Sequence, residues 1–382
     1  MTRVSIQPIM FIWARQRAQM DEAVLLARFP RLMEWESGAI QPTLRQLEQF
    51  AQATHAPLGY FFLPEPPRED LPIPDFRTMG RDSPRLTADL LDVIFTCQTR
   101  QTWYRDEALV NGEKPLPFVA CVTMETPPME VAQRIREVLG FSVEARSECP
   151  TWAEALRLFI AQAEQAGVMV MVSGVVMNNN TRQLNPREFR GFALADKLAP
   201  LVFINGADSK AAQMFTLAHE LAHLWLGQSA LSDARISEVS DYAVEVWCNQ
   251  VAAELLVPRA DFLDALRADE PLDAALKRLA RHFKVSTLVL LRRMWDVGYL
   301  DRAAFWRAYR DEEARLRSLA ERNAGGGDFY RTTVARVSKR FAQSLVASTL
   351  EGRTLYRDAF RMLGIAKSGT FNELGRILGF PT

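Results

Sequence analysis

The sequence predicts a mainly helical α+β protein in which a small sheet precedes a helix that carries a pair of histidines. Two observations predict this class. Apolar residues recur at helical spacing over most of the 382 residues, and three short runs rich in Val, Phe and Ile interrupt that pattern between residues 168 and 205. With 48% hydrophobic residues, the chain is long enough for two or three domains, because single cores seldom grow beyond about 250 residues.

The N-terminal part of the chain divides at a cluster of prolines. Residues 1–63 follow a helical pattern, and five prolines then occur between residues 64 and 74. We therefore assign residues 1–63 to one helical domain, and residues 64–150 to a proline-rich linker and helical connecting region. The helical pattern resumes in this region from Leu86 to about Gly112.

The next segment, residues 151–300, contains the predicted sheet. The order of residues from Thr151 to Glu154 is that of a capping box, which predicts a helix running to about Ala166. Strands are then expected at Val168 to Ser173, Gly191 to Ala195 and Leu201 to Asn205.

Two helices follow the strands. Either Asp208 or Ser209 can cap the first, which we expect to stop at Gly227. A polar loop over residues 228–240 leads to the second, expected from about Asp241 to Leu256. Residues 301–382 form a helical C-terminal extension with one break at residues 323–328.

Charge and cysteine usage limit the class of partner. Lys plus Arg and Asp plus Glu each number 46, so the net charge is zero and no overall field attracts nucleic acid or an acidic membrane. No run approaches the roughly 18 apolar residues that a membrane span needs. The four cysteines lie far apart without a CxxC spacing, which is typical of reduced thiols. We therefore expect a soluble cytoplasmic protein with no membrane partner, in which any contact with DNA is local.

His219 and His223 are candidate metal ligands. On a helix, positions four apart share a face, so two imidazoles can reach one ion while Glu220 lies beside it. The HExxH pattern is short and often occurs by coincidence. Here the flanking residues are nearly all apolar, and two of the chain's four histidines fall in this turn. Because burying three polar groups together without a function is costly, the pattern favours a zinc site in which Glu220 activates a zinc-bound water.

The third metal ligand must come from a second element. The helix expected from Asp241 offers Asp241 itself, Glu245 and Glu254. Glu245 and Asn249 share a face, so the carboxylate can bind metal while the Asn249 amide supports the site from behind the ligands. Glu254 lies more than two turns further along and suits a structural contact, and Asp241 is the reserve candidate.

Two motifs together resemble the ImmA/IrrE family of zinc metallopeptidases. They are FTLAHELAHLWLG and the later EVWCNQVAAELLVP, and the segment RGFALADKLAPLVFINGADSK between residues 190 and 210 also resembles that family. The resemblance covers about residues 167–300. Cys248 stands where the family usually has Ala, and Val251 stands in place of Phe; both replacements are conservative in size or polarity.

The resemblance implies a zincin-like fold and a complete site. It implies one Zn²⁺ per chain, held by His219, His223 and Glu245, with Glu220 as the general base. Many members of the family cleave transcriptional repressors or are encoded beside toxin–antitoxin pairs. A protein substrate of either kind, a repressor or an antitoxin, is therefore the expected partner.

Residues 8–60 resemble a Cro/C1-type helix-turn-helix domain. The resemblance rests on Trp35-Glu36-Ser37-Gly38 followed by Pro42-Thr43-Leu44. The stretch before Trp35 is about one helical turn shorter than usual and contains Pro30, and Arg28, Arg31 and Arg45 are the candidate contacts to DNA phosphates. The alternative is a scaffold that holds a protein partner or packs on the peptidase.

The leading hypothesis is a regulatory zinc endopeptidase that cleaves a protein partner. The alternative is a DNA-binding regulator, or an antitoxin-like binding module, whose zinc site is structural or vestigial. For the peptidase, we expect the substrate to add as a strand to an edge supplied by residues 190–195 or 201–205. His282 and Tyr242 are further candidates for stabilising an oxyanion.

Overall fold

The computed structural model describes most of the chain and confirms a mainly helical α+β class with a small sheet. The described residues are 3–18, 20–69, 71–75, 86–232, 243–267, 269–320 and 329–381. The reserve ligand Asp241, the candidate Tyr242 and the predicted break at residues 323–328 lie outside them. Within this part of the chain, every helix falls short of the length and apolar character that a membrane span requires.

The chain folds as two compact units. The first takes the described residues up to Pro72 together with residues 86–95, and the second takes residues 73–75 and the described residues from Thr96 onward. Helix α5, Ala88–Val110, begins in the first unit and continues into the second.

Short helices around an aromatic core make up the N-terminal unit. The ring of Phe11 lies 5.6 Å from Trp35, 5.5 Å from Phe50 and 5.9 Å from Phe61 between centroids, and all four side chains are buried. This cluster gives a short chain segment a core of its own. Its helices are α1 Pro8–Ala18, α2 Glu22–Arg28, α3 Leu32–Glu36 and α4 Leu44–Ala53, followed by the 3₁₀ helix η1 Leu58–Phe62.

Capping side chains set the ends of these helices. The Asp21 side chain accepts a hydrogen bond from the backbone N–H of Ala23 at the start of α2, and Thr43 with Gln46 forms a capping box at the start of α4. Gly38 has a φ of +76°, so the predicted turn after Trp35 uses a left-handed conformation that favours glycine.

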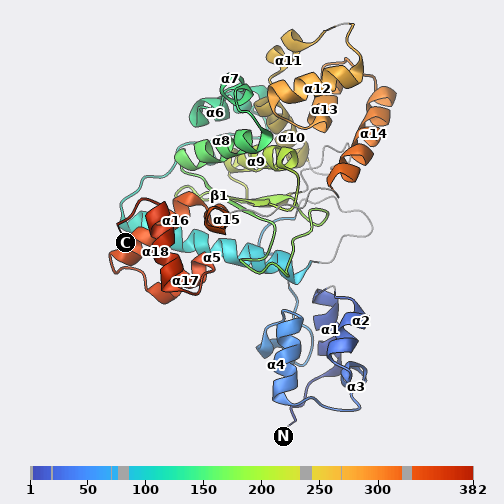
Figure 1. The fold of residues 1–382 in the computed structure, drawn as a ribbon, viewed down its shortest axis with the longest axis vertical. Helices are drawn as coiled ribbons and strands as arrows, with labels where there is room; N and C mark the ends of the chain where they lie inside the picture. The colour runs from blue at the N-terminus through green and yellow to red at the C-terminus, as the bar shows by residue number, and fades with distance from the viewer. Residues whose placement is uncertain are drawn as a thin grey trace. The chain divides into compact units, whose positions relative to one another are not determined.

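A four-stranded sheet lies at the centre of the second unit (Figure 1). Its order is β1-β3-β2-β4; β1 runs parallel to β3, and the other two pairs are antiparallel. The strands are β1 Met169–Ser173, β2 Gly191–Leu194, β3 Leu201–Asn205 and β4 Ala230–Ser232. The three predicted strands are confirmed, and β4 was not predicted.

The order of the strands corrects the predicted substrate edge. Both segments proposed for it are interior, because β3 pairs with β1 and β2, and β2 pairs with β3 and β4. The sheet's edges are β1 and β4. Nearly every strand residue is buried, which explains why the strands read as continuous apolar runs rather than as alternating ones.

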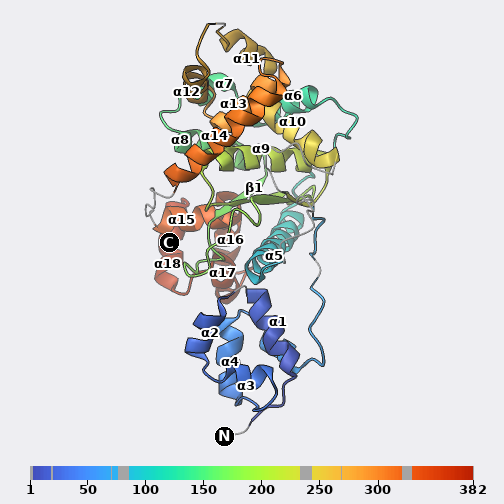
Figure 2. The same cartoon turned by 90° about the vertical axis from the view of Figure 1, so that its right-hand side faces the viewer.

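Helices cover both faces of the sheet (Figures 1 and 2). Helix α8, Trp152–Gln165, and helix α9, Lys210–Leu226, lie on one face, while α5 and the helices α15 and α16 lie on the other. The remaining helices are α6 Pro128–Leu139, α7 Val143–Ser147, α10 Ala243–Leu256, α11 Arg259–Ala265, α12 Leu272–Phe283, α13 Thr287–Asp296, α14 Arg302–Ala320, α15 Phe329–Val337, α16 Lys339–Leu350, α17 Tyr356–Leu363 and α18 Ser368–Ile377.

The C-terminal segment is part of this second unit. Glu164 at the end of α8 accepts hydrogen bonds from the Ser338 hydroxyl, at 2.5 Å, and from the backbone N–H of Lys339, at 2.8 Å. Helices α15 and α16 also contact β1. The predicted helical extension is therefore confirmed as helical, and it covers the sheet beside β1.

Candidate metal centre

Helix α9 places two histidines and a glutamate inside the protein. The Ser209 side chain caps its start by accepting a hydrogen bond from the N–H of Ala212, and Gly227 ends it with a φ of +73°. His219, Glu220 and His223 are fully buried. Because His219 and His223 are one turn apart, both imidazoles face the same neighbour, helix α10.

Helix α10 supplies the carboxylate that completes the group. The two Nε2 atoms of His219 and His223 are 3.1 Å apart. Glu245 places one carboxylate oxygen 3.2 Å from Nε2 of His219 and the other 3.1 Å from Nε2 of His223. Glu245 is only 2% exposed, so these atoms converge in a region shielded from water.

The hydrogen bonding of His219 fixes which ring nitrogen is available. Its Nδ1 lies 2.9 Å from Oδ1 of Asn249, and a carbonyl oxygen only accepts hydrogen bonds. Nδ1 therefore carries the hydrogen, so Nε2, which faces Glu245 and His223, is the nitrogen that can offer a lone pair to a metal ion when the ring is neutral. Neither oxygen of Glu245 receives a hydrogen bond of ordinary geometry from the described residues. A cation fits this convergence of acceptors, so the described residues include a possible His-His-Glu metal site.

Burial is the largest single influence on the pKa of Glu220 and on that of Glu245, yet the two resulting pKa values differ widely. It raises the pKa of Glu220 to about 8, with Glu245 adding to the rise and His219 opposing it. Burial also acts to raise the pKa of Glu245, but His219 and His223 outweigh it and hold that pKa at about 2. Two neighbouring carboxyls with separated pKa values suit different tasks, Glu245 as an ionised ligand and Glu220 as a proton acceptor.

The pKa values of the two imidazoles are also shifted in opposite directions. Burial acts to lower the pKa of His219, but the charge and hydrogen bond of Glu245 outweigh it, so the pKa is raised. Burial lowers the pKa of His223 and keeps that ring neutral, the form in which imidazole binds a metal.

Strand β2 approaches Glu220 so closely that glycine is required there. A Cβ added at Gly191 would lie 2.5 Å from Cγ2 of Thr216, 2.8 Å from the carbonyl oxygen of Phe203 and 3.3 Å from Oε1 of Glu220. The sheet therefore packs directly against the turn of α9 that carries Glu220. This contact excludes water from one side of the carboxylate.

Ser232 is a member of the site that the sequence did not reveal. It lies in β4, is fully buried, and has its Oγ 3.2 Å from Nε2 of His223. Its hydroxyl also contributes to lowering the pKa of Glu220, although burial has the larger, opposite effect. No motif marks this serine, because β4 is only three residues long and its pairing with β2 is a long-range contact.

The other candidates lie away from this group. Glu254 forms an ion pair with Arg293 at 2.8 Å and accepts a hydrogen bond from the backbone N–H of Arg259, which confirms the structural contact expected for it. His282 is exposed near the end of α12 and belongs to no metal-ligating cluster among the described residues. The oxyanion role suggested for His282 therefore has no support from the geometry.

The three arginines considered for DNA contact are exposed in the N-terminal unit. Arg28 ends α2, Arg31 precedes α3, and Arg45 lies in the first turn of α4. Helix α3 has only five residues, in agreement with the shortened segment seen in the sequence. Contact with DNA stays a prediction.

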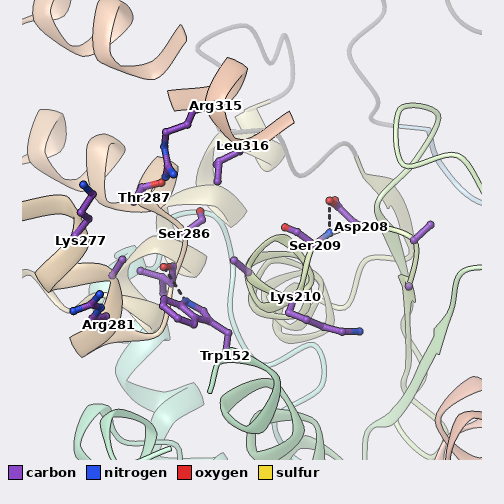
Figure 3. A pocket seen from close by; sticks show the side chains of 15 residues that line it. Trp152, Asp208, Ser209, Lys210, Lys277, Arg281, Ser286, Thr287, Arg315 and Leu316 are labelled. Carbon is purple, nitrogen blue, oxygen red and sulfur yellow. Dashed lines mark hydrogen bonds between the residues drawn. The ribbon is translucent and has the colours of Figure 1, made fainter. Parts of the chain in front are cut away.

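A cavity of about 890 Å³ opens at the N-terminal end of α9 (Figure 3). The turn before α9, helix α12 and the start of α13 line it, and Lys210, Lys277 and Arg281 make it basic. None of the three metal-ligating side chains lines this cavity. This cavity and the convergent side chains are thus in different places, and the proposed site is located by its chemistry.

Comparison with known proteins identifies this region independently. Residues 163–294 match the family described as IrrE N-terminal-like domain, a peptidase family, and residues 337–377 match a domain of unknown function, DUF8813. The chain is also similar to the radiation response metalloprotease IrrE of Deinococcus radiodurans, with 35% identity over 91 residues. That match covers 22% of this chain and 28% of the relative, so the chain spans little more than a quarter of the protein that it resembles.

Proposed function

We propose that the chain is a regulatory zinc-dependent endopeptidase that cleaves a protein partner, because residues 163–294 match the IrrE N-terminal-like domain of the ImmA/IrrE metallopeptidases. One observation carries the proposal. Three side chains direct acceptor atoms at one buried point, and Glu220 lies beside them as a carboxyl whose pKa is about 8. A purely structural ion pair would not require a second buried carboxyl group beside it.

The residues present fit a zinc ion. His219 and His223 would bind through Nε2, and Glu245 would bind through its carboxylate, a set of three protein ligands typical of catalytic rather than structural zinc. Asn249 would hold the His219 ring in place through its hydrogen bond to Nδ1. When bound, zinc would polarise the scissile carbonyl and lower the pKa of water at the site.

Glu220 would carry the proton in this reaction. Burial raises the pKa of Glu220 to about 8 in the metal-free protein, and the charge of a bound zinc ion would lower it again. The carboxylate could then accept a proton from the attacking water and release it to the leaving amine. The contact with β2 holds the carboxylate against the sheet and keeps bulk water from it. Ser232 lies on the neighbouring strand β4, paired with Gly191, where its hydroxyl would orient Glu220 and the His223 ring.

The substrate we propose is a regulatory protein such as a repressor or an antitoxin. Mapping new N-termini tests this. Total protein from the host cell is incubated with the zinc-loaded chain, and with the same chain after chelation. We expect a small set of new N-termini that need zinc. An identical set of N-termini in both samples would favour the alternative, a DNA-binding regulator or antitoxin-like module whose zinc site is structural or vestigial.

The N-terminal unit would bring the peptidase to DNA or to its protein partner. Exposed Arg28, Arg31 and Arg45 support DNA contact through phosphates, although α3 is too short to present a long reading face. We expect a DNA mobility shift that weakens with salt and is lost when the three arginines are changed to glutamate. A shift unaffected by that change would remove these residues from the DNA contact and favour the scaffold role.

A further inference from the structure

Strand β4 is the edge of the sheet that passes the metal-ligating group. Within the sheet it pairs with β2 alone, whereas the opposite edge, β1, is contacted by helices α8, α15 and α16. Ser232, the last residue of β4, brings its hydroxyl within 3.2 Å of Nε2 of His223. An extended peptide that added to this edge would therefore run directly beside the ligands.

A short segment of the same chain lies on this edge. The backbone N–H of Leu231 donates a hydrogen bond of 2.9 Å to the carbonyl oxygen of Pro74, and Asp75 forms a parallel bridge with Leu231. The side chain of Ile73 is buried, at 6% exposure. Because the pairing is parallel, the segment advances from Pro74 to Asp75 in the same direction as β4 advances from Leu231 to Ser232, toward the metal ligands.

The sequence of this segment limits how firmly it can pair. In an extended chain, the N–H and C=O of one residue point to the same side, and the residue that faces β4 is a proline. Pro74 accepts from the N–H of Leu231 but has no N–H of its own, which in a parallel pair would donate to the carbonyl of Ser229, just before β4. An extended peptide with an ordinary residue in this place could form that further bond, so it would compete well against the segment that is there.

We propose that Ile73–Asp75 is a built-in occupant of the peptide-binding edge, which must leave β4 before a protein substrate can pair there. Residues 73–75 follow directly on the N-terminal unit in the chain, so the occupant is tethered and competes at a high effective concentration. That residues 73–75 occupy the edge of β4 follows from the geometry alone. That they inhibit cleavage rests on the proposed peptidase function.

The test compares three variants with the native full-length chain, each loaded with zinc. Ile73→Asp places a charge where the side chain is buried, whereas Leu63→Asp makes a nearly identical change at a residue that is 38% exposed and outside the pairing. Ile73→Ala, which shortens the side chain without adding charge, is a milder change at the same position. All three are also made with Glu220→Gln, so that a bound peptide is not cut.

Two readouts report occupancy without any catalysis. Hydrogen exchange of the Leu231 amide should be slow in the native chain and in Leu63→Asp, and at least roughly tenfold faster in Ile73→Asp. A fluorescent synthetic peptide with the sequence of residues 68–78 should bind Ile73→Asp at least roughly tenfold more tightly than the native chain, because it no longer competes with a tethered copy. Equal exchange and equal peptide affinity in the native chain and Ile73→Asp would overturn the proposal.

Cleavage of casein, an unfolded protein, reports inhibition. With active Glu220, the zinc-loaded Ile73→Asp chain should cut casein at least severalfold faster than the native chain, with Ile73→Ala in between. Zinc-dependent cleavage at equal rates in all forms would refute inhibition by the segment. If exchange and peptide binding change as expected while no form cuts casein and none yields zinc-dependent new N-termini from host protein, the occupied edge stands and the proposed peptidase function fails.

Discussion

Alanine at His223 or at Glu245 should reduce bound zinc from about one ion per chain to roughly a tenth of that or less, because each change leaves two protein ligands where a catalytic site needs three. Both side chains are buried and directed at the same point, so no exposed neighbour among the described residues can replace them. Elemental mass spectrometry of the purified proteins measures the ratio.

Two further variants provide an intermediate case and a control for the zinc measurement. Asn249→Ala should keep zinc but bind it about 10–100-fold more weakly, since it loses only the hydrogen bond that orients His219. Gln250→Ala, an exposed position on the same helix, should match the native chain. Zinc retained in Glu245→Ala would show that α10 supplies a different ligand.

Glu220→Gln should retain zinc and lose peptidase activity by about 10²–10⁴-fold, the range expected when a general base is removed. Glutamine has nearly the same shape as glutamate and fits against Gly191, but its amide cannot accept the proton of the attacking water. The measurement is the initial rate of casein cleavage at matched zinc content.

The matched control is Glu137→Gln, the same chemical change at an exposed position on α6. It should leave the rate unchanged. A Glu220→Gln chain as active as the native one would exclude Glu220 as the base and would favour a regulator whose zinc site is structural.

The parts of the site that could be predicted from the sequence are pairs of residues spaced four apart on one helix. His219 and His223 are one turn apart on one helix, and Glu245 and Asn249 are one turn apart on the next, so helical geometry alone brings each pair to a single face. The three strands before α9 could also be predicted, because buried strands appear in the sequence as continuous apolar runs.

The remaining features depend on contacts between distant residues, which leave no periodic trace. Ser232 reaches the site through the pairing of β4 with β2, and the short β4 carries too few residues to show a strand pattern. Because β4 was not predicted, the substrate edge was assigned to β2 or β3, which are interior strands of the sheet. Likewise, Glu164 and Ser338 are 174 residues apart, so the docking of α16 on α8 could not be read from either segment.

X-ray absorption at the zinc edge of the native, zinc-loaded chain tests the central claim most directly. The ligands named here predict two imidazole nitrogens at about 2.0–2.1 Å, oxygen in the remaining positions, and no sulfur. A sulfur neighbour at about 2.3 Å would contradict this assignment. It would point instead to Cys248, the buried thiol that lies on α10 between Glu245 and Asn249.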